Sequence, residues 1–372
     1  MGSLKERGME ERARADVSFH NAYPESCDYL DGLRLKRYPA EAIAGMEPGG
    51  KLAAGFADGC EIRFASLSEF VNVTLFAEFQ DGSALVYKGD HFCGRYELPK
   101  DRYTSIRLQE PPGFARTVPS CAGVRGFSRE VWRIHLQHCG VVFCGIEASD
   151  HPVRVPRPDE LPERTMLAYG SSITQGSSSL INTCGYVFTA GRLLGADVLN
   201  KGMGGSCVME RSAADSLARM DGWDFAWLEL GVNMVRERFT VEQLRERTTY
   251  LLHTLLANHP EKMIFITSIF PNFHFGGQDE RAVQTLRYME AIKEVHRQAA
   301  HPRCVWIDSE QIMSDASWLS ADLLHPSTEG HAAMGFRLAE KIGTCLPGIR
   351  GGETIANTRH PADGVHRLPG SE

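Results

Sequence analysis

The chain has 372 residues, more than one domain usually holds, so two domains are expected. Apolar residues make up 42% of it and charged residues 23%, which is ordinary for a globular protein. The net charge of −7 and the lack of a basic stripe argue against a nucleic-acid partner, and no apolar run reaches the roughly 20 residues of a membrane span, so no membrane partner is expected either.

The first segment, residues 1–16, is predicted to be a charged tail. It carries a charge at almost every other position and lacks the apolar core of a signal peptide. The ten cysteines of the chain are scattered and form no C-x-x-C pair. Without an export signal, such cysteines are typical of free thiols in a reducing compartment, and we expect a cytoplasmic protein.

Residues 17–150 are predicted to form an all-β domain. Apolar and polar residues alternate over positions 61–64, 71–79 and 132–136, which is the period of half-buried strands, and residues 141–146 form a further apolar run. Asp81-Gly82 and Gly89-Asp90 are turn signals between such runs. Several short strands without a long helical pattern indicate a β-sandwich of the jelly-roll type.

Residues 151–164 contain four prolines and are predicted to be a linker. Residues 165–347 then alternate between apolar runs and helical stretches. The strand-like runs are 166–169, 198–199, 225–230, 263–270 and 305–307, and the helical stretches are 186–194, 241–258, 281–299 and 328–342. Such alternation predicts a three-layer α/β domain, with a parallel sheet between two layers of helices. Residues 348–372 lack apolar periodicity and are predicted to be a disordered tail.

Two motifs of the α/β domain carry the residue types of nucleophilic catalysis. Ser172 lies in Gly170-Ser171-Ser172-Ile173-Thr174, on a turn directly after an apolar run, where a serine is a candidate nucleophile. Asp322 and His325 lie about 150 positions downstream, three residues apart. This spacing lets the carboxylate hold the imidazole in the tautomer that a general base requires.

Two glycine-containing segments lie between these motifs in the chain. The first covers residues 200–205 and ends in Gly204-Gly205, and the second is Gly231-Val232-Asn233. Each follows a strand-like run, so both are expected at the same edge of the sheet as Ser172, because ligands bind beyond the carboxyl ends of parallel strands. A glycine amide and an asparagine side chain at this edge are suitable donors to an oxyanion.

The four segments, in this order and with this spacing, resemble the blocks of the SGNH (GDSL-type) hydrolase family, in the branch whose first block reads Gly-Ser-Ser-Ile-Thr. The resemblance covers residues 165–347 and implies a flavodoxin-like parallel sheet, which the branch often precedes with a β-sandwich. It implies a catalytic triad of Ser172, Asp322 and His325. It also implies an oxyanion hole formed by the backbone amides of Ser172 and Gly205 and by the side chain of Asn233.

Two positions depart from the commonest form of the family blocks. Ser171 stands where Asp is usual, and Met234 stands where many members have Asp after the asparagine. Neither position carries the chemistry in the family. The departures therefore bear on the support of the loops and on the subfamily, not on the type of reaction.

Other residues compete for the same roles. Ser171 is the alternative nucleophile, and Asp308 and Asp315 are the alternative acids of the triad. Cys207 is expected to be a buried spectator thiol. Glu229, inside an apolar run, is expected to be a buried structural carboxylate without a catalytic role.

No metal site is expected. His135 and His138 are three positions apart in a strand-like run, so they would point to opposite faces. The chain contains no H-x-x-x-H pattern and no cluster of Cys and His with the spacing of metal ligands.

The sequence therefore predicts a serine esterase that acts on a small-molecule ester through an acyl-enzyme and needs no cofactor. Family members with a preceding sandwich are often carbohydrate esterases, so the expected substrates are short-chain, above all acetyl, esters of a sugar or a similar polar alcohol. Two alternatives stay open: a biosynthetic acylhydrolase or acyltransferase acting on a lipid, thioester or natural product, and a carbohydrate-binding protein with a vestigial SGNH domain. Assembly into a homo-oligomer is compatible with the sequence.

Overall fold

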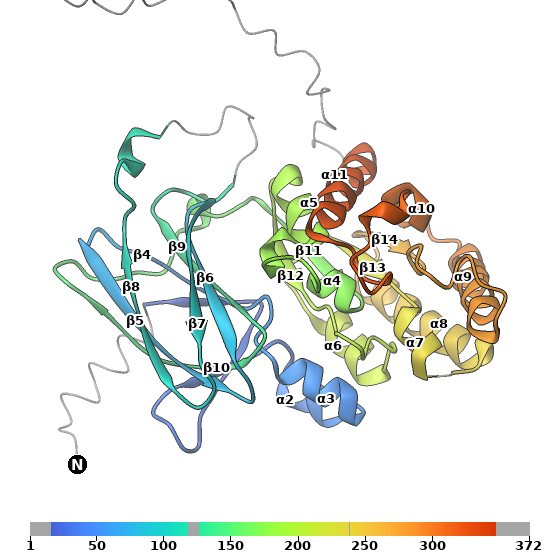
Figure 1. Ribbon diagram of the computed structural model, residues 1–372, viewed down its shortest axis with the longest axis horizontal. Coiled ribbons are helices and arrows are strands. Elements are labelled where there is room, and N and C mark those ends of the chain that lie inside the picture. Colours follow the sequence, from blue (N-terminus) through green and yellow to red (C-terminus); the bar gives the residue numbers. More distant parts are fainter. Residues whose placement is uncertain (1–15, 118–125, 238, 347–372) are drawn as a thin grey trace, which may run out of the picture.

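The computed structural model describes residues 16–117, 126–237 and 239–346, so the two predicted tails lie almost wholly outside the described residues. An all-β part and an α/β part stand side by side (Figure 1). Among the described residues, no helix has the length and apolar character that crossing a membrane requires.

The all-β part consists of two antiparallel sheets of five strands each, in the orders β1-β4-β9-β6-β7 and β2-β3-β10-β5-β8. From β3 to β10 the chain changes sheet at every step except the β6–β7 hairpin. This is the eight-stranded jelly-roll arrangement, with β1 and β2 added, as the sequence predicts. The strands are β1 (Ser18–His20), β2 (Tyr23–Ser26), β3 (Leu33–Lys36), β4 (Glu61–Ala65), β5 (Phe70–Glu78), β6 (Gly82–Lys88), β7 (His91–Leu98), β8 (Tyr103–Gln109), β9 (Val131–Gln137) and β10 (Gly140–Ala148).

Strand β5 shows how the alternating sequence builds this core. Val71, Val73 and Leu75 are buried between the two sheets, whereas the residues between them are half-buried. The turn signal at Gly89-Asp90 is the β6–β7 hairpin, and the one at Asp81-Gly82 leads from one sheet into the other. Strand β7, which lies at the edge of its sheet, is not among the predicted runs, and its residues are exposed or half-buried except for Leu98.

The α/β part is built on a parallel sheet of five strands in the order β12-β11-β13-β14-β15. The first strand in the chain is thus second in the sheet, which is the flavodoxin-like order. Each strand falls on one of the predicted apolar runs, although the fourth ends at Thr267, before the end of its run. The strands are β11 (Arg164–Tyr169), β12 (Ala196–Asn200), β13 (Phe225–Glu229), β14 (Met263–Thr267) and β15 (Cys304–Trp306).

Helices cover both faces of this sheet, as Figure 1 shows. Helices α6 (Arg211–Arg219), α8 (Val241–Asn258) and α9 (Glu280–Ala299) share one buried cluster with the sheet, and α5 (Tyr186–Leu194) and α11 (Thr328–Cys345) share the other. The four predicted helical stretches correspond to α5, α8, α9 and α11. Helix α6 was not predicted, because its apolar face consists mainly of alanines. Three short helices follow strands: α4 (Ser172–Gln175), α7 (Val232–Glu237) and α10 (Ser309–Ile312).

Two short helices from the N-terminal part of the chain pack against the α/β part. They are α2 (Ala40–Ala44) and α3 (Pro48–Gly55), which lie beside α6 in Figure 1. Ala42 and Ala54 belong to the same buried cluster as Leu217 of α6. The predicted division near residue 150 therefore does not describe the packing of these helices, which are too short and too rich in Gly and Ala to show a helical period.

Buried ion pairs join the two parts. Arg63 of β4 forms two hydrogen bonds with Asp197 of β12, of 2.5 and 2.8 Å, and its Nε donates to Glu61 at 2.7 Å. Arg133 of β9 donates two further bonds to Glu61. Burial disfavours both carboxylates, but the guanidinium groups beside them hold the pKa of Glu61 and of Asp197 below their ordinary values. The Arg63–Asp197 pair thus links the two parts through buried charges that compensate each other.

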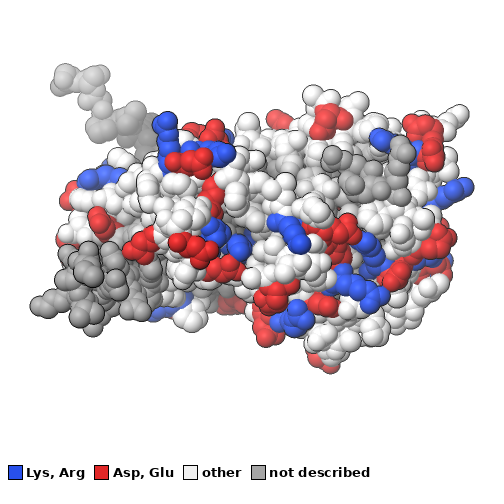
Figure 2. Space-filling view, turned by 90° about the horizontal axis from the view of Figure 1, so that it is seen from below, with Lys and Arg blue, Asp and Glu red and all other residues white. Residues whose placement is uncertain are grey.

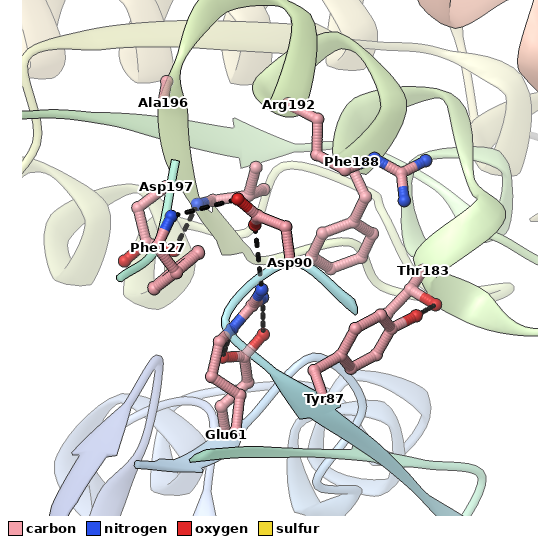
Figure 3. A pocket seen from close by; sticks show the side chains of 11 residues that line it. Glu61, Tyr87, Asp90, Phe127, Thr183, Phe188, Arg192, Ala196 and Asp197 are labelled. Carbon is pink, nitrogen blue, oxygen red and sulfur yellow. Dashed lines mark hydrogen bonds and ion pairs between the residues drawn. The ribbon is translucent and has the colours of Figure 1, made fainter. Parts of the chain in front are cut away.

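A small cavity of about 30 Å³ remains beside this network (Figure 3). Tyr87 of β6 lines it and shares a hydrogen bond of 2.7 Å with Thr183 of the α/β part. A volume of this size has room for about one water molecule and no substrate. The cavity is therefore a packing gap between the two parts.

We predict that Arg63→Met lowers the free energy of unfolding by about 3–5 kcal/mol, because it leaves the carboxylates of Glu61 and Asp197 buried with less compensation. Urea unfolding measures this change. The matched control is Arg95→Met, which removes an exposed pair with Glu97 on the same sandwich and should change the free energy of unfolding by less than about 1 kcal/mol. Equal effects of the two substitutions on the free energy of unfolding would contradict the proposed contribution of the buried Arg63 ion pairs to stability.

Candidate active site

Four segments converge at the carboxyl edge of the parallel sheet. Ser172 opens α4 directly after β11, residues 201–205 follow β12, and Asn233 lies in α7 after β13. The loop that carries Asp322 and His325 precedes α11. The structure thus brings the residues that the sequence proposes for the site to one edge of the sheet, where Ser172 and His325, 153 positions apart in the chain, are hydrogen-bonded.

Ser172, His325 and Asp322 form a continuous chain of hydrogen bonds. Ser172 Oγ lies 2.7 Å from His325 Nε2, and His325 Nδ1 lies 2.6 Å from Asp322 Oδ2. With Nδ1–H directed at the carboxylate, Nε2 is free to accept the proton of the serine hydroxyl. Ser172 is half-buried and the Asp322 side chain is 48% exposed, so the chain of bonds opens to solvent.

The second oxygen of Asp322 organises its own loop. Asp322 Oδ1 accepts hydrogen bonds of 2.9 Å from the backbone N–H groups of Leu324 and His325 and from the hydroxyl of Ser320. Partial burial favours the protonated acid, but these bonds and the His325 imidazole hold the pKa of Asp322 well below its ordinary value. Asp322 is therefore ionised whenever His325 needs a negative partner. Leu323, between them, has a φ of +54°, a backbone state that non-glycine residues rarely adopt.

A second histidine near the site is not a base. His331 of α11 is buried, its Nδ1 accepts the Tyr186 N–H at 3.3 Å, and its Nε2–H donates to the Ser177 carbonyl at 2.9 Å. Burial lowers the pKa of His331 to about 4. It is a neutral group that ties α11 to the segment after Ser172.

Three groups, on the segments that follow β11, β12 and β13, are proposed as donors to an oxyanion beside Ser172. The backbone amides of Ser172 and Gly205 take part in no backbone hydrogen bond with the described residues. Gly205 has a φ of +69°, which a glycine adopts without strain. Asn233 Oδ1 accepts the Cys207 N–H at 2.9 Å, so the amide nitrogen of Asn233 is left to donate.

The loop at residues 201–205 is held from two sides. Asn200 Nδ2 donates to the Thr174 carbonyl at 2.8 Å, and its Oδ1 accepts the Gly202 N–H at 2.9 Å, which ties the loop to the turn of the nucleophile. From the N-terminal part, the Arg37 guanidinium donates to the Gly202 carbonyl, and Lys201 Nζ donates to the Arg37 carbonyl. Arg37 is fully buried, and burial lowers the pKa of Lys201 to about 7. The sequence did not indicate this contribution of the sandwich part to the loop.

A buried carboxyl group lies under the turn of the nucleophile. Glu229 Oε2 accepts the Ser171 N–H at 2.8 Å, the Ser171 hydroxyl at 2.7 Å and the Thr174 hydroxyl at 3.1 Å. Ser171 is fully buried, whereas Ser172 faces His325. Of the two adjacent serines, only Ser172 is therefore placed to react.

Residues 168–333 match the model of a family described as the GDSL-like lipase/acylhydrolase family. This part of the chain is a GDSL-like acylhydrolase domain. The resemblance to SGNH (GDSL-type) hydrolases is thereby confirmed. None of the curated proteins matches the chain in sequence.

Several solved structures align with about nine-tenths of this chain, and therefore with segments of both its all-β and its α/β part. A salicylyl-acyltransferase from a tetracycline biosynthetic pathway is 14% identical, with a TM-score of 0.75 over 91% of this chain and 100% of its own. A family two carbohydrate esterase from Clostridium thermocellum is 12% identical, with a TM-score of 0.59 over 89% of this chain and 99% of its own. An acetyl xylan esterase from the rumen bacterium Butyrivibrio proteoclasticus is 12% identical, with a TM-score of 0.58 over 89% of this chain and 96% of its own. At these identities the likeness shows a shared fold.

The alternative residues of the acylhydrolase domain have other partners. Asp308 accepts hydrogen bonds from Trp306 and Lys293, and Asp315 accepts the Ser317 N–H, so neither orients His325. Cys207 is buried, and burial raises the pKa of its thiol far above the ordinary value. Its thiol is therefore not a reactive thiolate. The described residues include no group of three His, Cys, Asp or Glu side chains that could hold a metal ion.

The charge of Glu229 is predicted to make the stability of the acylhydrolase domain depend on pH. Burial raises the pKa of Glu229 to about 7 from 4.5, against the opposing effect of its hydrogen bonds with Ser171 and Thr174. The folded state therefore keeps its proton where the unfolded chain has lost it. This contribution to stability is complete below pH 4.5 and is lost as the pH rises to about 7, which amounts to about 3 kcal/mol.

The comparison of wild type with Glu229→Gln isolates this effect, because glutamine does not titrate. The difference in free energy of unfolding between the two proteins should shift in favour of the variant between pH 4.5 and pH 8. A difference that stays constant over this range would show that Glu229 keeps an ordinary pKa.

Proposed function

We propose that the protein is a serine esterase that removes short acyl groups, in the first place acetyl, from a carbohydrate or a similar polar alcohol. The observation that carries the proposal is the hydrogen-bonded chain from Ser172 Oγ through His325 to Asp322 at the carboxyl edge of the sheet. The acylhydrolase domain supports the reaction class. An esterase that acts on small-molecule esters is thus the general activity, and the acetylated sugar is the more specific proposal.

The reaction proceeds in two acyl transfers. His325 Nε2 takes the proton of Ser172 Oγ as the oxygen attacks the ester carbonyl, and Asp322 stabilises the imidazolium that forms. The oxyanion is held by the Ser172 and Gly205 amides and the Asn233 side chain. His325 then gives its proton to the leaving alcohol, and the acyl group stays on Ser172. A water molecule, deprotonated by His325, attacks the acyl-enzyme, and the acid departs as Ser172 regains its proton.

The fold supports a sugar as the alcohol part of the ester. Two of the proteins that share the sandwich-plus-hydrolase fold are a carbohydrate esterase and an acetyl xylan esterase.

On the face seen in Figure 2, acidic and basic side chains are interspersed among the described residues, so this face offers no basic surface for a nucleic acid. The cytoplasmic location and a homo-oligomer stay predictions from the sequence.

A panel of esters tests the substrate class. Acetylated mono- and oligosaccharides, p-nitrophenyl acetate and p-nitrophenyl octanoate are compared by kcat/KM. The proposal expects acetyl to be preferred to octanoyl and acetylated sugars to be turned over. Preference for octanoyl, or no turnover of any acetylated sugar alongside rapid cleavage of the aryl acetate, would contradict it.

Acyl transfer to an acceptor other than water is the second candidate. Leu323 and Phe273 are 53% and 51% exposed, and the Phe273 N–H donates to the Leu323 carbonyl at 3.0 Å, two residues before His325. The leaving group must lie beside His325, so these apolar side chains favour an acceptor with an apolar face there. Adding an aromatic alcohol during turnover of p-nitrophenyl acetate would then yield its acetyl ester as the main product. Release of acetate alone at all concentrations of alcohol would favour hydrolysis.

A further inference from the structure

Glu229 ends strand β13 with its side chain wholly buried in the α/β part. The hydrogen bonds that its Oε2 accepts all come from the turn of the nucleophile: from the N–H and the hydroxyl of Ser171 and from the hydroxyl of Thr174. Its second oxygen, Oε1, has no hydrogen-bond partner among the described residues. Burying a carboxyl group without a cation opposes folding, so a role in the strand alone does not explain it.

The neighbouring strand shows what this position needs for folding. Thr267 of β14 is the partner of Glu229 in the sheet, is also fully buried, and its hydroxyl has no hydrogen-bond partner among the described residues. A small side chain of low polarity would therefore fit this end of the sheet. The carboxyl group of Glu229 instead reaches across to the loop after β11.

The contacts of Glu229 set the geometry of the turn. The Ser171 hydroxyl, which donates to Glu229, accepts the Ile173 N–H at 3.1 Å and so caps the short helix α4 that Ser172 opens. Gly170 leaves room for this contact, because a Cβ atom there would lie 2.7 Å from Glu229 Oε2. The Thr174 hydroxyl continues the network to Tyr186, which also accepts the Trp227 indole N–H.

We propose that Glu229 is a positioning residue for catalysis, whose carboxyl oxygen fixes the Ser171–Thr174 turn so that Ser172 Oγ faces His325 and the Ser172 amide faces the oxyanion. Glu229 touches no substrate and acts through Ser171. This role rests on the proposed function of Ser172 as nucleophile. It requires an acceptor oxygen at the position of Oε2, and a negative charge is not part of the requirement.

The test compares Glu229→Met, which removes the acceptor, with Glu229→Gln, which keeps one. Thr267→Val is the matched control, because it changes a buried polar side chain at the same level of the next strand. The readouts are kcat and KM with p-nitrophenyl acetate, the rate of labelling by a fluorophosphonate, and the melting temperature. Labelling reports the reactivity of Ser172 without reference to the natural substrate.

Glu229→Met should lower kcat and the labelling rate about 100-fold, since a misplacement of about 1 Å has such an effect, with KM within about threefold of wild type. In Glu229→Gln and in Thr267→Val, kcat and the labelling rate should each stay within about tenfold of wild type. Labelling of folded Glu229→Met at the wild-type rate, or no recovery in Glu229→Gln, would overturn the proposal.

Ser171→Ala decides the matter if Glu229→Met does not accumulate as folded protein. Loss of the Ser171 hydroxyl breaks the link from Glu229 to Ile173, and labelling should slow about tenfold. An unchanged labelling rate would overturn the positioning role. Failure of the wild type to react with the fluorophosphonate at Ser172 would instead count against the proposed function.

Discussion

Ser172→Ala should reduce esterase activity about 10⁴- to 10⁶-fold and leave only the small residual rate that the oxyanion donors and substrate binding sustain. The hydroxyl lies 2.7 Å from His325 Nε2, so it can lose a proton to the base and attack a carbonyl held by the proposed donors of Gly205 and Asn233. The residue is half-buried, so the loss of one oxygen should leave the fold intact. Turnover of p-nitrophenyl acetate and the melting temperature measure the two effects.

Ser171→Ala is the control, because it removes a hydroxyl from the adjacent residue. The Ser171 hydroxyl is directed into the protein toward Glu229. Its loss should shift the turn that carries Ser172 and so lower esterase activity about tenfold, which leaves clearly measurable activity. If Ser171→Ala were as damaging as Ser172→Ala in a folded protein, the assignment of the nucleophile would be wrong.

Asn233→Ala should lower kcat about 10²- to 10³-fold with little change in KM, the effect expected for one oxyanion donor. The Asn233 Oδ1 atom is fixed by the Cys207 N–H, so its amide nitrogen is oriented before substrate binds. A preorganised donor acts on the charge that develops in the transition state, and so affects kcat more than KM. Steady-state kinetics with p-nitrophenyl acetate separate the two constants.

Asn233→Asp separates the donor from the support of the loop. Aspartate keeps an oxygen for the Cys207 N–H but replaces the donor with a second acceptor, so it should be at least as inactive as Asn233→Ala while the loop keeps its hydrogen bond. A large rise in KM at unchanged kcat in either variant would show that Asn233 binds the substrate and does not serve the oxyanion.

Much of the fold could be predicted because the spacing of apolar residues in the sequence indicates most of its strands. The alternation in β5 and the apolar runs of β11 and β13 reflect one-sided and two-sided burial, and the strand–helix alternation leads directly to a parallel sheet. Helices α2 and α3 could not be predicted in the same way. They are short, and what stabilises them is packing against α6, more than 150 positions away in the sequence.

The site was predictable where its chemistry lies in short motifs. Ser172 and His325 stand in recognisable frames, and the geometry brings them together. Two of the residues that hold the site in place, by contrast, belong to no sequence motif. Arg37 binds a backbone carbonyl, at Gly202, which leaves no mark in the sequence. Glu229 was correctly expected to be buried, but Ser171 was considered as a departure from the family block and as an alternative nucleophile, and not as the partner of Glu229. A polar residue in an apolar run, paired with a departure beside the nucleophile, is the signal that could have linked them.

The central claim is that Ser172 forms the covalent acyl-enzyme, and stoichiometric labelling with a fluorophosphonate tests it most directly. Activity and labelling are followed together, and the modified residue is mapped by peptide mass spectrometry. The account predicts that one label per chain resides on Ser172 and that activity falls in proportion to labelling. Labelling of Ser171 or Cys207 instead, or full activity in protein whose Ser172 is completely labelled, would contradict it.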